Sequence, residues 1–210
     1  MYYKILITIV GLILALGACG NKSTHFKLPI LGNKTPVENN GKTDTIYHQI
    51  GNFSFINQNG DSVNNKTVAG KIYVADFFFT SCPTICPKVK RQMKRVYAEY
   101  ENNPAFLMIS HSIDTKFDTV GRLNWYAQKM NAKAPSWNFV TGEKTALYKI
   151  AYDYLLTALE GNEFEGGFDH SGAMALVDKK GHIRGLYDGL DEAKVNLLIQ
   201  DIAILLKEKD

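Results

Sequence analysis

The sequence predicts an α/β domain, because strand-like and helix-like segments alternate along most of its length. Residues 72–79 form a nearly continuous apolar run, which is typical of a central strand covered on both faces. After Pro87 the apolar residues recur with helical spacing, and a second apolar run follows at 106–110. Strand, helix and strand in this order indicate a layered α/β fold.

A β-hairpin is expected to open the domain. Residues 53–56 and 61–63 are strand-like, and the Asn59-Gly60 pair between them is a strong turn signal. After the central strand, the first helix carries an apolar face, with its basic residues mostly elsewhere: Lys88, Lys90, Arg91, Lys94 and Arg95. Further strands are expected at 106–110, 137–140, 173–177 and 182–187, and further helices at 119–130, 144–159 and 192–207.

Length and composition fit one domain with a short appendage. The chain has 210 residues, of which 45% are hydrophobic and 21% are charged, enough for a single sizeable core. The net charge is +3, and the charges are interspersed rather than gathered in a basic arm. This pattern argues against a nucleic-acid-binding protein.

The N-terminus has the pattern of an export signal. Lys4 precedes an apolar run at 5–16, which is shorter than the roughly 20 residues that a membrane span requires. The sequence Leu16-Gly17-Ala18-Cys19 resembles a bacterial lipobox. This resemblance implies that residues 1–18 are a lipoprotein signal peptide and that Cys19 carries a lipid. A plain signal peptide followed by an incidental cysteine is the alternative.

The segment after the predicted signal is polar and is expected to be a flexible tether. It spans residues 19–47, contains Pro29 and Pro36, and offers few apolar side chains to bury. An edge strand packed on the domain near residues 26–30 is the alternative. The predicted domain occupies residues 48–210, on the extracytoplasmic side of a membrane to which Cys19 anchors it.

Cys82 and Cys86 are the two cysteines that remain after Cys19. A disulfide between residues so close in sequence closes a very short loop and stabilises little, so a chemical role is expected. A cysteine pair where the first strand meets the first helix suggests a thioredoxin-like fold, here with an N-terminal β-hairpin extension and an internal insertion between residues 117 and 140. The helix start favours thiolates, which serve both redox exchange and metal binding.

His170 is the candidate third ligand. It precedes the predicted strand 173–177, and in a thioredoxin-like fold the loop before that strand faces the cysteine helix. Oxidoreductases of this fold usually carry a cis-proline there, whereas this chain has Asp169-His170-Ser171-Gly172. Two sulfurs and one imidazole suit copper, as Cu(I) or Cu(II), whereas structural zinc usually takes four ligands. Asp169 either orients the imidazole of His170 or caps a turn.

Three segments together resemble the Sco/SenC family. Residues 79–87 are similar to its Cys-Pro-x-x-Cys-Pro motif, Asp169-His170-Ser171 is similar to its distal Asp-His-[Ser/Thr] element, and residues 109–114 resemble its strand ending in Ser-[Val/Ile]-Asp. The resemblance implies a thioredoxin-like fold and copper held by Cys82, Cys86 and His170. It also implies a role in assembling the dinuclear copper site of cytochrome c oxidase, by delivering copper, by reducing the oxidase cysteines, or both.

Three classes of function therefore remain open. The first is a copper metallochaperone, whose partners would be the copper ion and either a copper-site subunit of cytochrome c oxidase or another periplasmic thiol or copper protein. The second is a metal-free extracytoplasmic thiol-disulfide oxidoreductase or peroxidase that uses Cys82 and Cys86 as a redox pair. The third is an interaction module, which would leave the cysteine pair without a use. Whether the protein is an enzyme depends on which of these holds.

Overall fold

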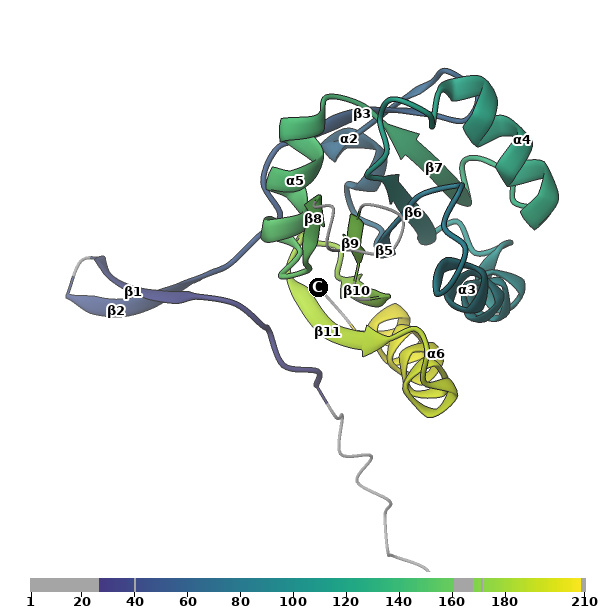
Figure 1. Cartoon of the computed structure of the whole chain (residues 1–210). Coiled ribbons are helices and arrows are strands. Elements are labelled where there is room, and N and C mark those ends of the chain that lie inside the picture. The colour runs from purple at the N-terminus through teal and green to yellow at the C-terminus, as the bar shows by residue number, and fades with distance from the viewer. Residues whose placement is uncertain (1–26, 40, 161–167, 171, 209–210) are drawn as a thin grey trace, which may run out of the picture.

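A seven-stranded mixed sheet forms the centre of the described chain (Figure 1). Its strands occur in the order β11-β10-β5-β6-β7-β3-β4. This computed structural model describes residues 27–39, 41–160, 168–170 and 172–208, and within these ranges it does not describe the side chains of 158–160 and 168–170. The predicted signal peptide and Cys19 lie outside the described residues.

Three parallel strands make up the middle of the sheet. β5 pairs with β6 and β6 pairs with β7, and the helices α3 and α4 make the two crossovers. Every residue of β5 is buried, as its apolar run predicts. The bounds are β5 Ile72–Phe78, α3 Cys86–Tyr100, β6 Phe106–Ser112, α4 Val120–Met130 and β7 Trp137–Thr141.

Antiparallel hairpins flank the parallel strands on both sides. β10 pairs with β5 so that Met174 lies opposite Asp76, which brings the start of β10 to the end of β5 that precedes the cysteines. The β3–β4 hairpin joins the other edge through β7, and Gly60 supplies the positive φ of 87° that its turn needs. The bounds are β3 Ser54–Asn57, β4 Ser62–Asn64, α2 Asn65–Val68, β10 Ala173–Val177 and β11 Ile183–Asp188.

Helices cover both faces of the sheet (Figure 1). Alternate residues of a strand point to opposite faces. On β5, Phe78 contacts the ring of Tyr126 in α4, whereas Phe77 meets the ring of Tyr154 edge-on at the end of α5. α3, α4 and α6 (Glu192–Lys207) therefore cover one face, and α5 (Lys144–Asp153) covers the other. This is the predicted thioredoxin-like order, with α4 and β7 as the internal insertion.

The segment before the domain contains strands that its polar composition did not indicate. β1 (Lys34–Asn39) and β2 (Lys42–Tyr47) form a two-stranded hairpin that projects from the domain (Figure 1). Closer to the N-terminus, Leu28 lies within residues 26–30, the alternative position for an edge strand; its side chain is buried against the domain, but residues 27–30 form no strand. Within the described ranges, no helix has the length and apolar character needed to cross a bilayer.

The helix expected at 144–159 is shorter in the structure, and this part of the prediction is wrong. α5 ends at Asp153, and the backbone turns at Leu155, whose φ is 57°. The amide of Leu156 donates to the carbonyl of Ala151, and the Leu156 side chain is buried, which is the pattern of a Schellman ending. After this turn, β8 (Ala158–Glu160) pairs with β9 (Phe168–His170).

His111 in β6 is fully buried on the face that α5 covers. Its ring stacks on Phe77 and contacts the rings of Phe55 and Tyr154. Nδ1 lies 3.2 Å from the carbonyl oxygen of Asp76, and Nε2 has no hydrogen-bond partner in the described part of the chain. Burial, together with the charge of Lys90, lowers the pKa of His111 to about 3.

This pKa predicts a pH dependence of folding. Because the unfolded pKa is about 6.5, the unfolded chain binds a proton that the folded chain excludes between pH 3 and 6.5. The stabilising effect of neutral His111 is therefore complete above pH 6.5 and is lost as the pH falls, by up to about 1.4 kcal/mol per pH unit. We expect His111→Phe, which suits the aromatic surroundings, to flatten this slope in urea unfolding measured from pH 4 to 7. Identical slopes for both proteins would contradict the assignment.

Candidate metal centre

Cys82 and Cys86 lie together at the start of α3. Cys82 belongs to the loop that follows β5, and Cys86 is the first residue of the helix. Neither is in a disulfide, and their exposed fractions are 7% and 4%. The amide of Cys86 donates to Sγ of Cys82 at 3.4 Å, so the loop folds the first sulfur back onto the helix start.

The surroundings of Cys86 oppose its ionisation. The hydrogen bond with the Cys82 side chain raises the pKa of Cys86, and burial raises it further. A backbone hydrogen bond from Phe79 and the charge of Lys90 act in the opposite direction, but more weakly. The sequence suggested that the helix start would favour thiolates at both positions. For Cys86, the thiol–sulfur hydrogen bond and burial outweigh that effect, so its proton must be displaced before the sulfur can bind a metal.

Asp118 holds the cysteine loop from outside α3. Its carboxylate accepts from the amide of Thr80 at 2.9 Å, from the Thr80 hydroxyl and from the Ser112 hydroxyl, and the residue is fully buried. Arg122 of α4 donates to the same Thr80 hydroxyl at 2.9 Å. The insertion therefore fixes the backbone two residues before Cys82. Sequence reasoning did not identify Asp118, because its partners come from different elements.

Lys90 lies one helical turn after Cys86 in α3 and is buried. Its ammonium is 2.6 Å from Oδ2 of Asp76 in β5 and 2.8 Å from the hydroxyl of Ser110 in β6. Both charged side chains are 1% exposed. The helical pattern predicts that the basic residues of this helix lie mostly away from its apolar face, and for Lys90 that prediction is wrong. The signal that could have corrected it is Asp76, a charged residue inside a strand predicted to be buried on both faces, which requires a cationic partner.

The chain that follows His170 reaches the same helix start. His170 ends β9, where it pairs with Ala158 of β8. Gly172, two residues on, has a φ of 69°, and a Cβ placed on it would lie 3.1 Å from Val89 and 3.5 Å from Ile85. Backbone close to His170 thus packs on the first turn of α3. The side chains of Asp169 and His170 lie outside the described atoms, so their roles stay predictions.

Of the other histidines in the described ranges, none joins the cysteines. His111 is buried on the face that α5 covers, and His48 bonds to the carbonyl of Asp153 at the end of α5. His182 lies in the turn before β11 and faces Asp178. Among the described side chains, which do not include that of His170, no three His, Cys, Asp or Glu residues form a group that could hold a metal ion.

Comparison with known proteins identifies a matching family model, SCO1/SenC, over residues 41–207. A relative from Stutzerimonas stutzeri, called a putative copper-binding protein, is 27% identical over 140 residues, which cover 65% of this chain and 67% of the relative.

Two solved structures share the fold at similar identity. The SCO1/SenC family lipoprotein of Bacillus anthracis is 26% identical with a TM-score of 0.68, over 76% of this chain and 95% of that chain. BsSco, described as a member of the Sco family of cytochrome c oxidase assembly proteins with a disulfide switch, is 26% identical with a TM-score of 0.67, over 77% of this chain and 95% of that chain.

The buried ion pair below Cys86 predicts a specific pattern of stability. Lys90→Met leaves the Asp76 carboxylate buried without its cation and should cost about 3–5 kcal/mol of unfolding free energy. Lys90→Met combined with Asp76→Leu removes both charges and should recover most of that loss. Urea unfolding measures both, with Lys94→Met on the exposed side of α3 as the control. If the double variant is no more stable than Lys90→Met, the cost does not come from an unpaired charge.

Proposed function

We propose that this chain, which belongs to the SCO1/SenC family, binds copper through Cys82, Cys86 and His170 and acts as a metallochaperone in the assembly of the dinuclear copper site of cytochrome c oxidase. The observation that carries the proposal is the pair of reduced, nearly buried cysteines hydrogen-bonded across the start of α3. The packing of Gly172 on the same helical turn supports His170 as the third ligand.

The cysteines fit a soft metal. Thiolate sulfur is the ligand type that selects soft Cu(I). When bound, the copper ion would replace the proton on Cys86. Lys90 favours the ionised form of Cys86 through its charge, although burial opposes ionisation. Asp118 holds the loop that presents Cys82, so little rearrangement of the backbone is needed for both sulfurs to bind.

The relatives support the same function. The protein from Stutzerimonas stutzeri is named for copper binding, and BsSco is described as a cytochrome c oxidase assembly protein. Carried over to this chain, these descriptions favour a copper-site subunit of the oxidase, or another periplasmic thiol or copper protein, as the partner. Transfer to such a partner requires access to the sulfurs, which lie at one end of the sheet, Cys82 in the loop after β5 and Cys86 at the start of α3.

A metal-free thiol-disulfide oxidoreductase is the second candidate. The observation in its favour is the contact between the Cys82 sulfur and the backbone of Cys86, which leaves the two cysteines close enough for reversible pairing. The disulfide switch described for BsSco supports reversible oxidation of such a pair. In this alternative His170 has no metal to bind.

His170→Ala separates the two candidates. If the chain binds copper, the variant retains both sulfurs but loses its only nitrogen ligand, and Cu(II) depends on nitrogen more than Cu(I) does. We expect Cu(II) affinity to fall by about tenfold or more, with loss of the sulfur-to-copper charge-transfer absorption. A Cu(II) titration followed by absorbance measures both, and His182→Ala, at the other end of the sheet, is the matched control.

Two outcomes would contradict the copper assignment. In one, wild type and His170→Ala give the same titration. In the other, neither protein binds copper, while both reduce a model disulfide at similar rates, which would favour the oxidoreductase.

We further propose that Cys19 carries a lipid that anchors the chain on the extracytoplasmic side of a membrane, after cleavage of residues 1–18. The lipobox-like sequence supports this, as does the similarity to a family lipoprotein of Bacillus anthracis. Cells grown with radioactive palmitate should label the wild-type chain, and Cys19→Ser should remove the label because the acceptor sulfur is gone. Equal labelling of both chains would exclude Cys19 as the lipid site.

A further inference from the structure

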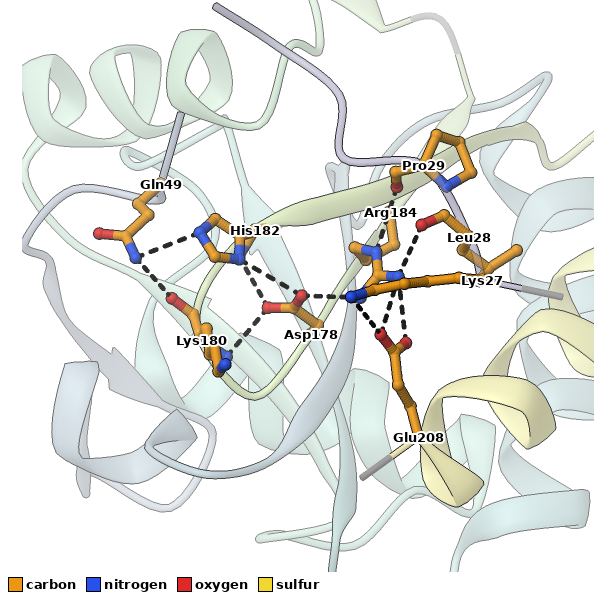
Figure 2. Close-up of polar contacts among 9 residues, drawn as sticks. All are labelled: Lys27, Leu28, Pro29, Gln49, Asp178, Lys180, His182, Arg184 and Glu208. Carbon is orange, nitrogen blue, oxygen red and sulfur yellow. Dashed lines mark hydrogen bonds and ion pairs between the residues drawn. The ribbon is translucent and has the colours of Figure 1, made fainter. Parts of the chain in front are cut away.

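Arg184 fastens the segment before the domain to the end of the sheet that is remote from the cysteines (Figure 2). Its guanidinium donates to the carbonyl oxygens of Leu28 and Pro29 at 2.6 and 3.1 Å. It also pairs with the carboxylates of Asp178 and Glu208, each at 3.0 Å. Because Arg184 is only 4% exposed, its donors are used within the protein, and the chain is held in place where it enters the domain.

A recess of about 270 Å³ opens beside this clamp. The turn between β10 and β11, the start of β5, the end of α6 and the segment around Lys27 line it. Asp178 fixes the turn by accepting from the amides of Lys180 and His182, both at 2.9 Å. The shape of the recess is therefore built by buried and hydrogen-bonded groups rather than by mobile side chains alone.

The lining of the recess is cationic. Four of its residues carry positive charge and two carry negative charge: Lys27, Lys179, Lys180 and Arg184 against Asp178 and Glu208. Both acidic groups face Arg184, and Glu208 also lies 3.6 Å from the ammonium of Lys27, so the lining keeps a net excess of positive charge.

This recess and the cysteines lie at opposite ends of the sheet. Val177 pairs with Tyr73 near the start of β5, and the turn that lines the recess follows Val177 directly. Cys82 follows the other end of β5, which has seven residues. The two ends are therefore separated by about 23 Å of strand. Lys27, the described residue nearest to Cys19 in the sequence, is among the residues that line the recess.

We propose that this recess and its lysine rim bind the phosphate groups of anionic phospholipids. The end of the domain that carries the recess then contacts the membrane surface. Cys82 and Cys86, at the opposite end of the sheet, face away from the membrane, toward an extracytoplasmic partner. Charge complementarity supports this occupant, since basic clusters beside a membrane anchor are attracted by anionic lipids. The orientation of the domain rests on the proposed anchor at Cys19, but the binding of phospholipid does not.

Vesicle co-sedimentation tests the proposal. The protein is the chain from residue 20 onward, which contains every described residue and lacks the lipid site. Vesicles of phosphatidylcholine with about 30 mol% phosphatidylglycerol should bind it, and vesicles of phosphatidylcholine alone should not. Lys179→Glu combined with Lys180→Glu should weaken binding by about tenfold or more. Lys179→Gln combined with Lys180→Gln, which adds no repulsion, should give a smaller loss.

The matched control carries the same charge change elsewhere. Lys88→Glu combined with Lys94→Glu alters two exposed lysines of α3 and should weaken binding less than about twofold, because these lysines would lie away from the lipid. An equal loss in the control would show that only net charge matters and would overturn the proposal. Binding to neutral vesicles would overturn it as well.

A competition arm identifies the source of the phosphate. Millimolar inorganic phosphate should not release the protein from vesicles, since a membrane presents many headgroups at once. Release at that concentration would make the recess a site for a soluble anion and would overturn the membrane proposal. Copper titration of the Lys179 and Lys180 variants should be unchanged, so failure here is distinguishable from failure of the copper assignment.

Discussion

The buried pair of Lys90 and Asp76 is the interaction on which the arrangement of the cysteine end depends. One ammonium joins α3 to β5 and, through the Ser110 hydroxyl, to β6, and the indole of Trp137 in β7 donates to the same hydroxyl at 3.0 Å. A helix held by apolar packing alone can slide or rotate on a sheet at little cost. A buried charge pair cannot shift without losing its partner, so it fixes the position of α3 and of Cys86 at its first turn.

The candidate centre then combines three supports of different kinds. The ion pair fixes the helix, Asp118 fixes the loop before Cys82, and the close approach of Gly172 to Val89 and Ile85 fixes the chain after His170. Each support comes from a different part of the sequence, so the centre forms only when the whole domain has folded. This arrangement suits a site whose ligands must be held ready for a metal while remaining near the surface, because preorganised ligands need little reordering on binding.

The sequence was sufficient to predict the α/β class, the central strands, the β3–β4 hairpin and the internal insertion, because each has a local pattern of apolar spacing or turn residues. It was not sufficient for Lys90, Asp118 or the end of α5. Lys90 and Asp118 are of residue types that usually lie on the surface. They are buried here because Lys90 pairs with Asp76 and Asp118 accepts from Thr80, contacts that form only in the tertiary structure. α5 ends through a left-handed Leu155 rather than a glycine, so the usual stop signal is missing, and the burial of Leu156 compensates for the strained backbone.

The projecting β1–β2 hairpin bears on how copies of the chain behave when they are crowded together. An exposed two-stranded ladder has two open edges, and open edges are where chains pair into aggregates. Pro36 in β1 has no amide hydrogen to offer a new strand, and charged residues are distributed along both strands: Lys34, Glu38, Lys42 and Asp44. The hairpin can therefore project from the domain without pairing with the hairpin of another copy. Even at high local density, the copies are expected to stay separate rather than assemble into fibres.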